Sequence, residues 1–219
     1  LPVNDPRARG QVVSRRIGPW TVLSERVVYD NPWIRVVDHA ITHPNGAPGQ
    51  YGVVRFKNRA VGVLPIFDDG TAALVGQHRF PFDAYSWELP EGGGPLDEDP
   101  LDAARRELKE ETGLSAKLWI PLASFDLSNS VTDEVAVCYL AADLKQGEAA
   151  PEDSEELQRR TVPFATLLED CLSGRVRDSL TLVMVLAASI KAARGELPPG
   201  VARAILGDAT MKDRSWANP

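Results

Sequence analysis

The chain has very little sulfur from which a disulfide framework or a thiolate metal centre could be built. Its 219 residues include only two cysteines, Cys138 and Cys171, which lie far apart and show no metal-ligand spacing. This pattern excludes a disulfide-stapled fold and is typical of a protein from a reducing compartment. We therefore interpret both cysteines as small buried apolar side chains and expect a cytoplasmic protein.

Long apolar runs and an excess of positive charge are also missing. The most apolar stretch, LTLVMVLAASI, is too short to span a bilayer and predicts a buried helix. The N-terminal segment lacks the charged, apolar and small-residue order of a signal peptide. A net charge of -7 argues against a broad nucleic-acid or membrane surface, so neither partner is expected. Phosphate substrates remain possible, because a divalent cation can supply positive charge.

What the chain does contain is the composition of a globular protein, with 43% hydrophobic and 25% charged residues. We predict three segments, which are an N-terminal β unit at residues 1–52, a main domain at 53–195, and a C-terminal helix and tail at 196–219. β-Branched runs broken by turn signals indicate that the first segment is antiparallel. The runs AVGVLPIF and TAALVGQHR, separated by the turn DDG, predict a hairpin.

Three candidate metal-binding carboxylates lie on one short predicted helix. Asp99 is a good N-cap, Pro100 a good first helical residue and Gly113 a good stop, so a helix is predicted between them. On this helix one face is apolar, and the adjacent face gathers three carboxylates: Glu107, Glu110 and Glu111.

These carboxylates repel one another. At ~5.5 Å and an effective dielectric of ~20, each like-charged pair costs about 3 kcal/mol, which suggests that a positive partner is expected there. Mg²⁺ prefers oxygen ligands, and Glu107 and Glu111 can share one ion because they are four residues apart. The alternative is an ordinary solvated helix face supported by Arg106 and Lys109.

The spacing of Gly92, five residues, Glu98, seven residues and then RELKEETGL resembles the Nudix box of the Nudix hydrolases at every defined position. The flanking segments QHR, WELPEGG and SGRVRDSLT extend the resemblance, which is closest to the ADP-ribose pyrophosphatase group. The resemblance implies an α+β fold, with an αβα sandwich around a mixed sheet. A small N-terminal antiparallel β unit would precede that sandwich.

The resemblance also implies roles for the residues of the box and a divalent metal cofactor, Mg²⁺ with Mn²⁺ as the alternative. The chief metal ligands are Glu107 and Glu111. Glu110 lies beside them and can take part in catalysis, and the backbone carbonyl of Glu91 approaches the metal. Glu98 and Arg106 form a pair that braces the loop against the helix, and Gly92 and Gly113 are structural.

Outside the box the resemblance points to substrate contacts. Arg79 matches an arginine near the diphosphate, although it could also be a structural arginine at a strand end. Glu134 closes SNSVTDE, where related enzymes carry a Ser-Pro-Gly stretch that ends in Glu; here Asn129 and Ser130 replace the Pro and Gly. Trp33 lies where related enzymes stack the base, often across a homodimer interface, and packing in a core is the alternative.

The general base in this group comes from a loop that corresponds here to EAAPEDSEEL. Its carboxylates Glu152, Asp153, Glu155 and Glu156 are all candidates, and we favour Glu155, with Glu152 and Asp153 next. An acidic loop is also ordinary protein surface. A carboxylate on a mobile loop could couple closure to chemistry.

The predicted activity is metal-dependent hydrolysis of the diphosphate bond of a nucleoside-diphosphate sugar, with ADP-ribose giving AMP and ribose 5-phosphate. One alternative is GDP-mannose or another sugar nucleotide, which Asn129 favours. A second alternative, from another class, is a ligand sensor that does not cleave its ligand. The presence of all four box carboxylates argues against that sensor.

Overall fold

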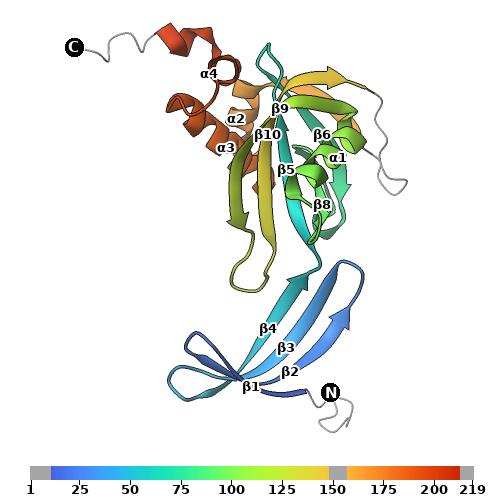
Figure 1. Cartoon of the computed structure of the whole chain (residues 1–219), viewed down its shortest axis with the longest axis vertical. Coiled ribbons are helices and arrows are strands. Elements are labelled where there is room, and N and C mark those ends of the chain that lie inside the picture. The colour runs from blue at the N-terminus through green and yellow to red at the C-terminus, as the bar shows by residue number, and fades with distance from the viewer. Residues whose placement is uncertain (1–10, 148–156, 213–219) are drawn as a thin grey trace, which may run out of the picture. The chain divides into compact units, whose positions relative to one another are not determined.

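The computed structural model describes residues 11–147 and 157–212, and its strands and helices fall into two compact units (Figure 1). The first unit comprises the residues up to 58 together with 126–135. The second comprises residues 59–125 and those from 136 onward. A short segment from the middle of the chain therefore belongs with the N-terminal strands.

The first unit is a four-stranded antiparallel sheet in the order β1-β2-β3-β4, as its β-branched runs predicted. The strands are β1 (Gln11–Ile17), β2 (Trp20–Asp30), β3 (Ile34–Thr42) and β4 (Pro48–Phe56). On β3, Val37, His39 and Ile41 are buried in the alternation expected of a strand with one covered face. Segment 126–135 joins this sheet through a bridge between Val54 and Thr132.

The second unit contains a mixed sheet and a smaller antiparallel sheet. The mixed sheet has the order β8-β5-β10-β9, with β5 parallel to β10, and the other has the order β11-β6-β7. The mixed-sheet α+β class is therefore as predicted. The strands are β5 (Asn58–Pro65), β6 (Thr71–Arg79), β7 (Ala84–Glu88), β8 (Glu91–Pro95), β9 (Leu114–Asp126), β10 (Val135–Gln146) and β11 (Gln158–Pro163), with a 3-10 turn at Phe80–Phe82.

The predicted hairpin of β5 and β6 forms only at its tip. A turn with Gly70 at φ 82° and a bridge between Ile66 and Ala72 connect the strands, which then enter different sheets. Most residues of both strands are buried. A continuous apolar run of this kind indicates burial but does not specify a pairing partner. Gly92, Gly93 and Gly94 lie in strand β8, beside β5.

Helices cover the mixed sheet from both sides. α1 (Pro100–Thr112) packs Ala104 and Leu108 into a cluster that includes Val63 of β5. α3 (Ser179–Ala193) approaches β5 from its other face, because a Cβ on Gly62 would lie 2.8 Å from the Met184 methyl. Figure 1 shows α3 gathered with α2 (Phe164–Leu172) and α4 (Pro199–Lys212), and α1 apart from them beside β8.

Two predictions about apolar features are confirmed. Cys138 and Cys171 are both buried and unpaired, and the apolar LTLVMVLAASI stretch forms α3. Within residues 11–147 and 157–212, no helix combines the length and apolarity that a membrane crossing requires.

Candidate active site

Helix α1 begins and ends where the sequence predicted. The Asp99 side chain accepts a hydrogen bond from the Leu101 amide at 2.8 Å, and Gly113 closes the helix in the left-handed region at φ 74°. Ala103, Ala104 and Leu108 are fully buried. Because these side chains fix the rotation of the helix, the carboxylate face has one defined direction.

Arg106 holds the carboxylates of the box together. Its guanidinium donates to Glu107 at 2.7 Å, to Glu110 at 3.1 Å and to Glu98 at 3.4 Å, and it also donates to the Gly93 carbonyl at 3.0 Å. Burial disfavours the charged guanidinium, but these carboxylates outweigh it and raise the pKa of Arg106. One cation therefore offsets part of the repulsion among three negative groups and ties the β8 backbone to the helix.

Glycine at position 92 allows β8 to lie directly against the Glu107 carboxylate. A Cβ at Gly92 would come within 2.2 Å of the Glu107 carboxyl carbon, which is far closer than any real contact. Any larger residue would have to displace that carboxylate. The requirement for glycine is therefore steric and concerns the position of a predicted metal ligand.

Glu111 is the most buried of the three carboxylates, with only 2% of its surface exposed. Its Oε2 accepts a hydrogen bond from the Glu91 amide at 3.0 Å, and its carbonyl accepts from the Arg159 guanidinium. The first residue of β8 is thereby held beside the last turn of α1. A buried carboxylate in contact with the backbone is positioned for coordination more rigidly than a surface one.

A second carboxylate cluster, formed by Glu88, Glu91 and Asp178, lies next to this point. Each of the three offers an oxygen within 4.8 Å of the others. Arg79 donates to both Glu88 oxygens, at 3.0 and 2.9 Å through Nε, and to Glu91 at 2.6 Å. The sequence predicted Arg79 beside a diphosphate, and the structure shows its guanidinium engaged with two carboxylates.

Burial, and then the neighbouring Asp178, raise the pKa of the Glu91 carboxyl well above its usual value. Its Oε2 is buried, and no hydrogen-bond partner for it occurs within the described ranges. Hard oxygen donors of this kind suit Mg²⁺, so the residues present fit a divalent cation. Sequence reasoning assigned only the carbonyl of Glu91, and it missed Glu88 and Asp178. The signal that could have found Asp178 is its N-cap position before α3, where it accepts from the Thr181 amide at 2.6 Å.

The other predicted substrate contacts belong to the first unit. Trp33 is 65% exposed, and its amide donates to the Asn31 side chain at 2.9 Å, so packing in a core does not account for it. Glu134 is half-buried, and burial followed by the charge of Asp133 raises its pKa. The predicted base candidates Glu152, Asp153, Glu155 and Glu156 lie outside the described residues.

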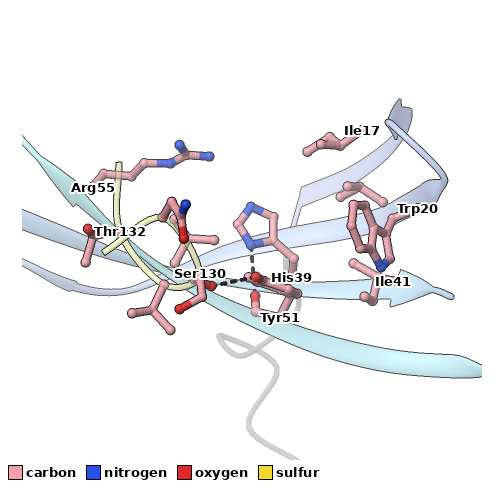
Figure 2. Close-up of a pocket in the computed structure, with 12 residues that line it drawn as sticks. Ile17, Trp20, His39, Ile41, Tyr51, Arg55, Ser130 and Thr132 are labelled. Atoms are coloured by element: carbon pink, nitrogen blue, oxygen red, sulfur yellow. Dashed lines mark hydrogen bonds between the residues drawn. The ribbon is translucent and has the colours of Figure 1, made fainter. Parts of the chain in front are cut away.

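The first unit has a cavity of about 240 Å³ that the sequence did not predict (Figure 2). Trp20 stands at one end of it and Arg55 at the other, with Asn129 and Ser130 also in its wall. Tyr51 donates from its hydroxyl to the Ser130 carbonyl at 2.5 Å, which anchors segment 126–135 to the sheet. Trp33 does not line this cavity, whose aromatic side chains are Trp20, His39 and Tyr51.

A family model described as NUDIX domain matches residues 56–181, which is more than half of the chain. The chain belongs to the NUDIX family. The match contains the whole box and all of α1, so the resemblance to Nudix hydrolases is confirmed at the level of the family. A second model, described as nucleoside diphosphate sugar hydrolase N-terminal domain, matches residues 20–54.

Several characterised proteins are similar to this Nudix chain. An ADP-ribose pyrophosphatase from Mycobacterium tuberculosis is 34% identical over 58% of this chain and 63% of its own length, so the chain spans less than two thirds of that relative. A CMP-5'-(N-acetyl-N-hydroxy-3-aminopropyl)phosphonate hydrolase from Streptomyces rubellomurinus is 33% identical over 77% and 81%. An ADP-ribose pyrophosphatase from Bacillus subtilis is 31% identical over 68% and 82%.

A solved structure described as an ADP compounds hydrolase superposes with a TM-score of 0.73. It covers 84% of this chain and 100% of its own, at 21% sequence identity. This similarity supports the fold, an αβα sandwich with a preceding antiparallel sheet.

Proposed function

We propose that this Nudix protein hydrolyses the diphosphate bond of nucleoside-diphosphate sugars, with ADP-ribose as the first substrate to test and AMP and ribose 5-phosphate as products. The observation that carries the proposal is the carboxylate face of α1, which Arg106 and the β8 backbone hold in place. The names of two similar proteins, both ADP-ribose pyrophosphatases, support the substrate class.

Glu107 and Glu111 would hold Mg²⁺, or Mn²⁺, together with Glu110 and the carbonyl of Glu91. When bound, the ion supplies positive charge to the diphosphate and acidifies the attacking water. The residues of the chain do the rest of the positioning. Arg106 keeps the carboxylates in register, and the glycines of β8 leave room for a phosphate to approach the backbone.

A carboxylate must take the proton from the water, and we propose Glu155 for this role, with Glu152 and Asp153 next. Glu134 is proposed as a substrate contact, because a half-buried carboxylate with a raised pKa can accept or donate a hydrogen bond. Trp33 remains our proposal for stacking the base. The cavity that contains Trp20 offers a second position for it.

The deciding experiment is a screen of sugar nucleotides with Mg²⁺, Mn²⁺ or EDTA, in which nucleoside monophosphate and sugar phosphate products are separated by chromatography. We expect metal-dependent release of AMP and ribose 5-phosphate from ADP-ribose. Preferential cleavage of GDP-mannose would support the alternative substrate, for which Asn129 in the cavity wall offers an amide that can bind a base edge. Tight binding of ADP-ribose without cleavage under any metal would show a sensor.

A further inference from the structure

The second unit has a larger cavity, of about 730 Å³, at the edge strand β7 and the segment that precedes α3. This volume lies in the range of small-molecule sites. Its wall carries four arginines and three carboxylates, namely Arg79, Arg160, Arg175 and Arg177 with Glu88, Asp170 and Asp178. A cavity rich in guanidinium groups selects ligands with negative charge.

Two of these arginines form ion pairs with neighbouring carboxylates, and the other two do not. Arg79 pairs with Glu88 and Glu91, and Arg175 pairs with Asp170 at 2.7 Å. Over residues 11–147 and 157–212, Arg160 and Arg177 form no ion pair, and both are exposed. Their charges are therefore available to a ligand in the cavity.

Arg160 is also held in a defined orientation. Its guanidinium carbon lies 4.0 Å from the centre of the Trp87 ring, which itself meets Tyr85 edge to face at 5.6 Å. Both aromatic rings lie over Gly76, where a Cβ would come within 2.5 Å of the Tyr85 hydroxyl and 2.8 Å of the Trp87 ring. Stacking on an aromatic face leaves the N–H edge of a guanidinium free to bind a planar oxyanion.

The cavity continues to the carboxylate cluster described above. Glu88 and Asp178 line it, and both have oxygens within 4.8 Å of Glu91. The Glu91 amide in turn binds Glu111 of α1 at 3.0 Å. Glu91 therefore connects the wall of this cavity with the carboxylate face of α1.

We propose that this cavity binds the non-nucleoside half of the substrate and selects one that carries a further anionic group, such as a carboxylate. Arg160 and Arg177 bind that group. The inference rests on the proposed hydrolysis of nucleoside-diphosphate sugars, because that reaction defines the two halves.

Two pairs of probes, measured by titration calorimetry on the full chain with Mg²⁺, isolate the two halves. Glucuronic acid 1-phosphate and glucose 1-phosphate differ only in the sugar carboxylate, whereas adenosine 2′,5′-bisphosphate and AMP differ only in a phosphate on the nucleoside. We expect the sugar acid to bind about tenfold more tightly than the neutral sugar, since a charge-assisted hydrogen bond contributes about that much.

Arg160→Gln and Arg177→Gln, made separately, should each reduce that preference to about threefold, because the two arginines share the binding of one group. Arg194→Gln is the matched control, because Arg194 lies at the end of α3 and pairs with Glu196 at 2.6 Å. It should leave the preference unchanged. Two independent arginine variants guard against a folding defect in one of them.

Equal affinity for the two sugar phosphates would overturn the proposal, as would a preference that neither arginine variant reduces. Discrimination between the two adenosine probes that depends on Arg160 or Arg177 would instead place the nucleoside half in this cavity. None of the four probes contains a diphosphate bond. The result is therefore separate from the hydrolysis screen, whose failure would remove the proposed reaction without altering these affinities.

Discussion

Glu111 is buried and carries a carboxylate that we predict to be a metal ligand. Replacing it with glutamine removes the charge and keeps the shape of the side chain. Glu111→Gln keeps an oxygen that can accept from the Glu91 amide. We expect kcat for ADP-ribose to fall by about 10²- to 10³-fold, as when charge stabilisation of a transition state is lost. Steady-state kinetics in saturating Mg²⁺ measure this effect.

The same variant should not lose stability in EDTA, because a charge is removed from a repulsive cluster. Glu169→Gln, on the exposed side of α2, is the control for both measurements. Near-normal turnover in Glu111→Gln would contradict the metal assignment. A clear loss of metal-free stability would show that Glu111 is mainly structural.

A substitution at Gly92 tests the same site, because this glycine leaves the space in which the Glu107 carboxylate lies. In Gly92→Ala the new methyl group must displace the Glu107 carboxylate, which it would otherwise approach within 2.2 Å. Because the end of a side chain can move, we expect a small stability change but a loss of Mn²⁺ affinity of about tenfold or more. Calorimetric titration measures the affinity, and Gly200→Ala is the control because its Cβ would meet nothing within 4 Å. Unchanged affinity for Mn²⁺ would argue against Glu107 as a ligand.

We predict that Arg79 contributes to the stability of the fold as well as to substrate binding. Arg79→Ala leaves Glu88, which is 3% exposed, and Glu91 without their cation. Breaking a buried ion pair from one side costs about 3 kcal/mol, which urea denaturation in EDTA would detect. Arg194→Ala removes an exposed pair and should cost less than about 1 kcal/mol. If instead only KM rises in Arg79→Ala, the role of Arg79 is confined to the substrate.

At the scale of the element, α1 depends on its N-cap. Asp99→Ala removes the acceptor for the Leu101 amide and should lower the free energy of unfolding by about 1 kcal/mol. Asp97→Ala, in the exposed loop before the helix, should change it very little. Asp99→Asn should restore most of the loss, since Asn is an equally good cap. A cap contribution that Asn fails to restore would indicate that the charge at Asp99, rather than its hydrogen bond, stabilises the helix.

Elements also show where sequence reasoning was limited. The ends of α1 followed from local signals, because caps and glycine stops act within one turn of a helix. The sequence did not predict the sheet partners of β5 and β6, because the apolar run in each strand indicates burial and does not specify a pairing partner. β10, which pairs with β5, lies more than 70 residues further along.

At the scale of the whole molecule, we propose a homodimer. Strand β2 exposes four large apolar side chains, Leu23, Val27, Val28 and Tyr29, which are candidates for contact with a second copy. Sedimentation velocity at micromolar concentration should give about twice the chain mass of 23.9 kDa. Val27→Glu should shift the protein toward monomer, whereas Ser24→Glu on the same strand tests for a general effect of charge. A fully active monomer would contradict a site shared between copies, and it would leave the family unaffected.

The sequence by itself determined the family, the helix that carries the carboxylates and the residues of the box. These follow from local spacing, since Gly92, Glu98 and RELKEETGL lie within 23 residues and each acts on its near neighbours. Only the tertiary structure decided that Asp178 joins Glu88 and Glu91, and that Arg160 stacks on Trp87. Those groups come from strands and helices far apart in the chain, and their contacts depend on how the sheets and helices pack, which no local pattern encodes.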